Sequence, residues 1–406
     1  MKILQISPEG NYGSVGTIAE QIGYLAKSEG HDSYIAIGNY YLPSNSKIYK
    51  IRGVIGRYYS VLLTRILDKN ALGSSHATRR LIKWIDKLDP DIIHIHQLHG
   101  YFININILFN YLSKLDIPIV LTLHDCWNFT GHCTYFDNIA CNKWKVECGN
   151  CPLLRDYPRS LLRDNSTENF RLKKHLFSSI NNLFLVSVSE WLSRKVSDSF
   201  LGNIPNKVIY NGVDTRIFNP IQFGKPNPFA FEDYFGKFII LGVASPWNDR
   251  KGLSDFIELA KLLDPDDIIV LIGLTKSQIS RLPDNIIGLE KIKSRELLAG
   301  YYRNSEVFIN FSVEETFGLT TVEAMASGTP AIVYNSTACP EIVSEDSGFI
   351  VEKRDIASVN KILQMLKSDT TELERYSENC VRRARSLFNS EDRYLDYIRL
   401  YSELVK

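Results

Sequence analysis

The sequence lacks a strong net charge, a long apolar run and any internal repeat. Its 47 lysines and arginines balance 46 aspartates and glutamates to a net charge of +1, so no global positive field favours nucleic acid as a partner. No window approaches the roughly 20 apolar residues that a membrane-spanning helix needs. The opening run, residues 1–7, is too short for a signal peptide and predicts a buried strand. We therefore expect a cytoplasmic protein that contacts a membrane, if at all, only peripherally at its inner face.

Cysteine is scarce, with seven residues in 406, and without a secretory signal a disulfide scaffold is not expected. Four of the seven lie close together with the spacing C-x7-C-x6-C-x2-C. The last pair has the spacing of a metal knuckle, and four thiolates complete a tetrahedral structural zinc site, which we favour over free thiols or disulfides. A catalytic zinc is not expected, because four protein ligands leave no open position. The four candidates are Cys133, Cys141, Cys148 and Cys151.

Length and patterning predict two α/β domains. A chain of 406 residues exceeds what one hydrophobic core usually supports. Short apolar strands alternate with amphipathic helices, which predicts βαβ units and parallel sheets covered on both faces. A polar stretch rich in proline and glycine, residues 219–227, separates two such series. We place the first domain at 1–218 and the second at 219–389, and an aromatic-rich helix within 390–406 could pack back on the first.

A glycine-rich loop follows the first predicted strand, at the end of the sheet where ligands bind in open parallel α/β proteins. Gly10, Gly13 and Gly16 have the spacing G-x-x-G-x-x-G, which is not the dinucleotide fingerprint. The second strand, 33–38, also ends without the acidic residue that would bind a ribose, which argues against a dehydrogenase. Glycines here let a ligand approach the backbone closely, and a plain tight turn is the alternative.

Histidines end two other strands of the first domain. His124 follows strand 119–123 and is either a packed residue or a chemical one. His94 and His96 alternate along a strand, so they point the same way. No third ligand has clear spacing, so we do not expect a metal there.

Two carboxylates surround a predicted helix start in the second domain. A strand at 307–311 enters a turn that carries Glu315, and a helix at 319–326 contains Glu323. The first amides of that helix point outward with the positive end of the dipole. Amides can hold a diphosphate, and carboxylates accept hydrogen bonds from sugar hydroxyls. Two solvated glutamates are the alternative. The amides belong to Gly318, Leu319 and Thr320.

Arg250 and Lys251 directly precede another predicted helix, 253–263. Two cations at a helix N-terminus oppose its dipole, which indicates that they serve an anion there. A planar guanidinium beside a compact ammonium suits a diphosphate leaving group. An ordinary solvated loop is the alternative.

Residues 47–83 form a basic segment with a single acid, Asp68. Ile55, Tyr58, Leu62 and Ile66 recur within it at helical spacing, which predicts a basic amphipathic helix resting on an anionic membrane. An ordinary surface helix is the alternative. The basic residues are Lys47, Lys50, Arg52, Arg57, Arg65, Lys69, Arg79, Arg80 and Lys83.

Together these segments resemble the family 4 retaining glycosyltransferases of the GT-B fold, in which two doubly wound Rossmann-like domains face a central cleft. The cysteine-bearing region resembles a subgroup attached to bacterial exopolysaccharide and lipopolysaccharide synthesis. The sequence departs from the family at one position. The family often has an arginine directly after the glycine of this strand, whereas here Val243-Ala244 follow Gly242, and we expect Arg250 to take the place of that arginine. The matching segments are Gly13–Gly16, Pro90–His94, Ser187–Glu190, Val208–Phe218, Arg250–Gly252, Glu315–Glu323 and Gly348–Ile350.

The resemblance implies a metal-independent hexosyltransferase that moves a sugar from a UDP- or GDP-sugar to a glycan or lipid-linked acceptor, with retention, in bacterial surface polysaccharide synthesis. It requires no cofactor for catalysis. The alternatives are a GT-B sugar-nucleotide epimerase or hydrolase and a non-catalytic, zinc-stabilised sugar-binding protein.

The resemblance also assigns roles to residues. Glu323 would hold the donor ribose and Glu315 the hydroxyls of the transferred sugar. Lys251 and Arg250 would stabilise the departing diphosphate together with the helix amides, and His124 would line the sugar pocket from the first domain. Further candidate donor contacts are Gly318, Leu319, Thr320, Gly13, Gly16 and Asn211.

Overall fold

The computed structural model describes residues 1–51, 53–220, 234 and 236–406. The chain divides into two compact units, Met1–Tyr210 with Arg393–Lys406, and Asn211–Asp392. This division precedes the boundary expected after residue 218. From residue 221 onward the predicted linker lies outside the described residues, as does Arg52.

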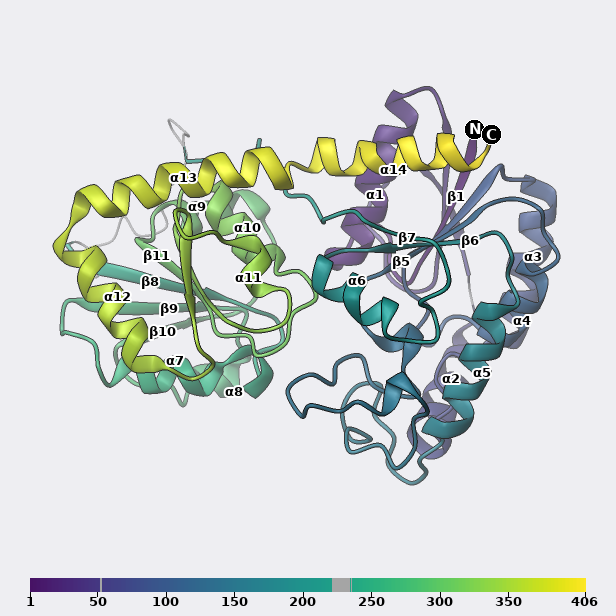
Figure 1. Cartoon of the computed structure of the whole chain (residues 1–406), viewed down its shortest axis with the longest axis horizontal. Coiled ribbons are helices and arrows are strands. Elements are labelled where there is room, and N and C mark those ends of the chain that lie inside the picture. Colours follow the sequence, from purple (N-terminus) through teal and green to yellow (C-terminus); the bar gives the residue numbers. More distant parts are fainter. Residues whose placement is uncertain (52, 221–233, 235) are drawn as a thin grey trace. The chain divides into compact units, whose positions relative to one another are not determined.

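The first unit is built on a seven-stranded parallel sheet with the order β3-β2-β1-β4-β5-β6-β7 (Figure 1). Ile3 of β1 pairs with Ser33 on one side and Ile92 on the other, so the order reverses between β1 and β4. The central strands are buried and mostly apolar, because helices cover both faces. The strands are β1 (Lys2–Ser7), β2 (Asp32–Ile37), β3 (Lys47–Lys50), β4 (Ile92–Ile95), β5 (Ile119–Leu123), β6 (Leu183–Ser187) and β7 (Asn206–Val208).

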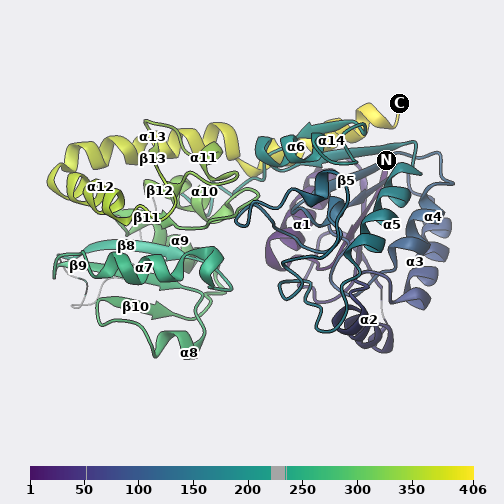
Figure 2. The same cartoon turned by 60° about the horizontal axis from the view of Figure 1, so that its bottom comes forward.

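Helices cover this sheet on both sides. Figure 2 shows α1 on one side and α3, α4 and α5 on the other. Tyr394, Tyr397 and Tyr401 of α14 are buried in one core with Ile18 and Ile22 of α1, so the final helix packs on the first unit. The helices are α1 (Gly13–Ser28), α2 (Val54–Leu67), α3 (Ser75–Leu88), α4 (Ile105–Leu112), α5 (Ser166–Ser178), α6 (Glu190–Ser197) and α14 (Ser390–Leu404).

The second unit holds a six-stranded parallel sheet with the order β10-β9-β8-β11-β12-β13. Val307 of β11 pairs with Ile240 of β8, and the strand order reverses between these two neighbours. This sheet is therefore also doubly wound. The strands are β8 (Phe238–Val243), β9 (Asp267–Ile272), β10 (Ile286–Leu289), β11 (Val307–Asn310), β12 (Ala331–Tyr334) and β13 (Gly348–Val351).

The core of the second unit joins α7 and α12 to the sheet. Phe256 and Leu259 of α7 share one buried cluster with Val359 and Leu363 of α12. Helix α10 packs against α9 and α13. The helix expected at 253–263 is shorter and ends at Ala260. The helices are α7 (Leu253–Ala260), α8 (Lys276–Ile279), α9 (Arg295–Arg303), α10 (Leu319–Ala326), α11 (Cys339–Ile342), α12 (Ile356–Ser368) and α13 (Thr370–Phe388).

The loops after β8 and β11 approach each other closely at Gly252, and glycine substitutions test this contact. Gly252 is left-handed (φ 73°), and a Cβ there would overlap the Cβ and carbonyl oxygen of Phe311. Gly236 is equally left-handed (φ 72°), but a Cβ there would have no atom of the described residues within 4 Å. We predict that Gly236→Ala costs about 1 kcal/mol of unfolding free energy through its φ angle alone. Gly252→Ala should cost at least about 2 kcal/mol more, because the added methyl group displaces backbone. Urea unfolding followed by circular dichroism measures both, and equal losses would contradict the packing argument.

Candidate active site

Two loops of the second unit meet where its strand order reverses, the place where doubly wound sheets bind ligands. The loop after β8 carries Arg250 and Lys251 in a short 3-10 turn, η4 (Asp249–Lys251). The loop after β11 carries Glu315. The Val313 N–H donates to the Arg250 carbonyl oxygen at 2.9 Å, which fastens the two loops together. Residues 64 positions apart in sequence thus form one site.

An ion pair lies at the centre of this site. Lys251 Nζ contacts Glu315 Oε1, and the two side chains are only 16% and 12% exposed. Ser312 Oγ donates to the same carboxylate oxygen at 3.3 Å, and the Glu315 N–H donates to Thr337 Oγ1 at 2.8 Å. Burial alone would raise the pKa of Glu315, but the charges of Lys251 and Arg250 hold it below its usual value. Glu315 is therefore an ionised and firmly positioned hydrogen-bond acceptor.

Arg250 lies alongside the pair. Its Nη1 donates to the Glu314 carbonyl oxygen at 3.0 Å. The charge of Arg250 also acts on the Glu315 carboxylate. Two cations thus act on the Glu315 carboxylate, and both can serve as counter-ions for an anionic ligand.

The start of α10 borders the same loop. Gly318 caps the helix in the left-handed region (φ 102°), a conformation that favours glycine. Asn310 fixes this end by donating to Thr321 Oγ1 at 3.0 Å and accepting from the Ser312 N–H at 3.1 Å. The amides of Leu319 and Thr320 belong to the first helical turn, where N–H groups have no acceptor inside the helix. A phosphate oxygen is a suitable partner for them.

Glu323 lies one turn into α10. Its Oε2 accepts a hydrogen bond from the hydroxyl of Tyr302 on α9 at 3.0 Å. Burial raises the pKa of Glu323 to about 7, although Tyr302 and the nearby Arg295 act to lower it. The carboxyl group therefore changes charge near neutral pH. Sequence reasoning missed both partners, because neither Tyr302 nor Arg295 lies in a recognisable motif.

Asn211 opens the second unit. Its side chain is buried, and Oδ1 has no hydrogen-bond partner among the described residues. A buried amide oxygen without a donor is costly, so it is a candidate ligand contact.

Three of the expected site residues lie in the first unit. His124 directly follows β5, and its Nε2 lies 3.3 Å from His96 Nδ1. Burial lowers its pKa to about 4, so the ring is neutral at pH 7. Gly13 begins α1, and a Cβ there would approach the Glu9 carboxylate to 2.7 Å. A Cβ at Gly16 would come within 3.0 Å of the Glu9 carbonyl oxygen. The Glu9 carboxylate beside this loop suits a ligand hydroxyl better than a phosphate.

Two family models match the chain. Glycosyltransferase Family 4 matches residues 13–217, about half of the chain, and Glycosyl transferases group 1 matches residues 230–385. The chain belongs to glycosyltransferase family 4. Its fold is GT-B, and the expectation of two doubly wound α/β domains is confirmed. Within the described ranges, no helix combines the length and the apolar character that crossing a bilayer requires.

Relatives of this glycosyltransferase are known in sequence and structure. The Escherichia coli K12 protein described as a colanic acid biosynthesis glycosyl transferase, WcaC, is 22% identical over 365 residues, covering 85% of this chain and 84% of its own. The MMP alpha-(1->4)-mannosyltransferase of Mycolicibacterium hassiacum is 28% identical over 331 residues, which cover 78% of this chain and 71% of the mannosyltransferase. Among solved structures, HepE of Anabaena in complex with UDP and glucose has a TM-score of 0.71 at 14% identity, with both chains fully covered.

The four clustered cysteines of this glycosyltransferase line one small cavity of about 20 Å³ in the first unit, together with His132. The Gly131 N–H donates to Cys148 Sγ at 3.2 Å. All seven cysteines are free thiols. No three histidine, cysteine, aspartate or glutamate side chains in the described part of the chain are arranged to hold a metal ion. Zinc at these cysteines therefore stays a prediction, and binding would require the sulfur atoms to close in around the cavity.

Metal analysis tests that prediction. If zinc is bound, protein purified without chelator should contain about one zinc per chain, and Cys148→Ser should lower that content. Cys380→Ser is the matched control, because Cys380 is a buried cysteine of the second unit that donates to main-chain carbonyls. Metal-free protein with seven titratable thiols would establish the thiol alternative.

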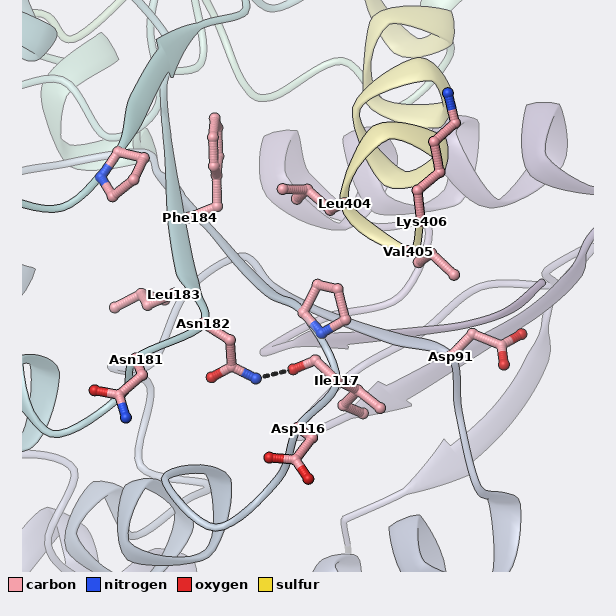
Figure 3. Close-up of a pocket in the computed structure, with 12 residues that line it drawn as sticks. Asp91, Asp116, Ile117, Asn181, Asn182, Leu183, Phe184, Leu404, Val405 and Lys406 are labelled. Atoms are coloured by element: carbon pink, nitrogen blue, oxygen red, sulfur yellow. Dashed lines mark hydrogen bonds between the residues drawn. The ribbon is translucent and has the colours of Figure 1, made fainter.

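A larger pocket of about 570 Å³ lies away from these residues, at the amino ends of β5 and β6 (Figure 3). Asn182 donates from there to the Leu115 carbonyl oxygen at 3.0 Å and also to that of Ile117, and Val405 and Lys406 line the pocket with it. It is at the edge opposite to the one where doubly wound sheets bind substrates. We assign it no part in the chemistry.

Proposed function

We propose that this glycosyltransferase moves a hexosyl group from a UDP- or GDP-sugar to a glycan or lipid-linked acceptor, with retention and without a divalent metal. The observation that carries the proposal is the Lys251–Glu315 pair beside the α10 amides at the strand-order reversal. HepE, solved with UDP and glucose, supports it through a shared fold. WcaC supports a place in bacterial surface polysaccharide synthesis.

The donor fits the second unit in three parts. The diphosphate lies against the first amides of α10, with Lys251 and Arg250 as its counter-ions. The ribose hydroxyls donate to Glu323, which the Tyr302 hydroxyl already orients. Hydroxyls of the transferred sugar donate to Glu315, whose ionised state makes it an acceptor only.

The reaction breaks the bond between the sugar C1 and the β-phosphate oxygen, and negative charge grows on that oxygen. Fixed cations and amides stabilise such charge without reorganising, which is the largest single contribution in many enzymes. The acceptor hydroxyl oxygen forms its bond to C1 on the face that the phosphate leaves. Its proton passes to the departing phosphate oxygen. With this arrangement the two cations perform the charge stabilisation that a bound metal would otherwise supply. A role for His124 beside the sugar stays a prediction.

A lysine comparison tests the cationic part of the site. A panel of UDP- and GDP-sugars first identifies the donor that is turned over. We then expect Lys251→Ala to lower kcat/KM by a factor of about 100 or more, a loss of roughly 2–4 kcal/mol of transition-state stabilisation. Lys261→Ala is the control, since the Lys261 side chain is 62% exposed and pairs with the exposed Glu258. Near-normal kcat/KM in a folded Lys251→Ala enzyme would overturn the assignment. Donor turnover to free sugar or an epimer without acceptor would instead identify a hydrolase or epimerase.

A pH dependence follows from Glu323. Its pKa near 7 means that the side chain is protonated below neutral pH and ionised above it. Ribose hydroxyls bind the ionised form better, so donor affinity should rise as pH increases through 7, by up to about tenfold per pH unit on the acidic side. Calorimetric titration with the nucleotide sugar measures it, because its diphosphate diester does not titrate in this range. Glu323→Gln should abolish the slope, and a slope that persists in that variant would assign it to another group.

We also propose that the enzyme works peripherally at the inner face of a membrane, where a lipid-linked acceptor would be presented. The E. coli relative named UDP-Gal:alpha-D-GlcNAc-diphosphoundecaprenol alpha-1,3-galactosyltransferase, 28% identical over 225 residues, supports an acceptor of this kind.

A further inference from the structure

Helix α2 is amphipathic in the reverse sense from an ordinary surface helix. Its face toward the protein is polar, with Ser60 and Thr64 completely buried. Its outward face carries large apolar and aromatic side chains that are exposed, from 36% at Ile66 upward. Ile55 is 87% exposed, Tyr58 73%, Tyr59 55% and Leu62 54%. Globular proteins normally bury such residues, so an exposed stripe of them marks a binding surface.

Hydrogen bonds hold the polar face inward. Ser60 Oγ donates to the Gly56 carbonyl oxygen at 2.8 Å and lies 3.0 Å from Ser74 Oγ. Thr64 Oγ1 donates to the Ser60 carbonyl oxygen at 2.8 Å. Rotating the helix to bury its apolar stripe would break the contact with Ser74 and leave the buried partners unsatisfied. These hydrogen bonds therefore keep the apolar stripe of α2 on the surface of the protein.

A neighbouring segment extends this stripe. The Leu161 N–H donates to the carbonyl oxygen of Arg65 in the last turn of α2 at 2.7 Å. Leu162 is 77% exposed, and Leu161 is exposed as well. We call the exposed side chains of α2 with these two leucines the α2 surface.

Positive charge surrounds the α2 surface. Arg57 and Lys69 are exposed on or next to the helix. Asp68, the one acid between residues 54 and 69, is buried, where Oδ1 lies 2.5 Å from His132 Nδ1 and Oδ2 accepts from the Asn165 N–H at 3.0 Å. The negative charge is thus withdrawn from the surface. Further exposed basic residues precede or follow the two leucines in sequence, with one exposed acid, Asp156, among them: Arg155, Arg159 and Arg163.

We propose that the α2 surface inserts into the headgroup layer of a bilayer that contains anionic lipid. Aliphatic side chains enter the acyl boundary, tyrosines tolerate the interface, and arginine and lysine reach the headgroups. Positive charge beside an apolar stripe favours an anionic bilayer as the partner of this surface. A second copy of the chain would present the same positive charges, and the two surfaces would repel each other. This inference rests on the proposed function, since it supplies the place where a lipid-linked acceptor meets the first unit.

Vesicle sedimentation with phosphatidylglycerol–phosphatidylcholine mixtures tests the surface. We expect binding that weakens as salt rises and falls about tenfold or more in Leu62→Glu, because one buried leucine-sized side chain contributes on that order. Leu262→Glu is the matched control, since Leu262 is 48% exposed in the second unit. The paired substitutions Arg57→Gln and Lys69→Gln should remove part of the salt dependence.

A second measurement reports insertion itself. Tyr58→Trp places a fluorophore on the stripe, and we expect a blue shift and quenching by lipid-borne quenchers when vesicles are added. Unchanged emission, or equal binding by Leu62→Glu and the wild type, would overturn the proposal. So would a dimer in sedimentation equilibrium that Leu62→Glu dissociates, because the surface would then bind a second copy.

Donor binding separates this inference from the proposed function. Leu62→Glu should bind the nucleotide sugar as tightly as the wild type, since Leu62 is not in the donor site. Vesicle binding lost with donor binding intact confirms the surface as an independent feature. If wild-type protein binds vesicles but no nucleotide sugar, the proposed function fails while the surface stands.

Discussion

The ion pair between Lys251 and Glu315 organises the donor site. Each charge is mostly removed from water, and each is tolerated because the other lies beside it. Gly252 allows the β8 loop to approach Phe311, and Ser312 of the β11 loop donates a hydrogen bond to the Glu315 carboxylate. A ligand that brings its own negative charge and hydroxyl groups can share both partners. The two side chains are thus preorganised for the donor before it binds.

The first unit depends on buried polar groups of a different kind. Lys173 is buried and donates to the carbonyl oxygens of Trp127 and Thr130 at 2.6 and 2.9 Å, with its ammonium 3.3 Å from the Trp127 ring centroid. Burial lowers its pKa to about 7. Asp68 and His132 form a second buried pair nearby. Together they fasten the cysteine-bearing loop to α5 and to the end of α2, and so hold the polar face of α2 inward.

The sequence predicted the strands and the donor motif well because their signals are local. Apolar runs located β8, β9, β11 and β12, and the segment 319–326 located α10. Strand β3 was missed because Lys47–Lys50 is a polar edge strand, and α13 because its helix is mostly solvated.

Features that depend on distant partners could not be predicted. The hydrogen bond from Tyr302 to Glu323 joins two helices, and the raised pKa of Glu323 comes from burial that no motif encodes. The spacing of Ile55, Tyr58 and Leu62 indicated an amphipathic helix. The spacing did not show that the apolar face is the outer one. That orientation depends on the contact between the Ser60 and Ser74 hydroxyl groups, which come from different segments.

The central claim is that fixed cations and helix amides of the second unit bind a nucleotide diphosphate-sugar without a metal ion. Calorimetric titration of the wild-type chain with UDP- and GDP-sugars in the presence of EDTA tests it most directly. The account predicts that one nucleotide sugar binds at a single site per chain with chelator present, and that the matching nucleoside monophosphate binds far more weakly. Binding that appears only when a divalent cation is added, or no binding by any nucleotide sugar, would contradict it.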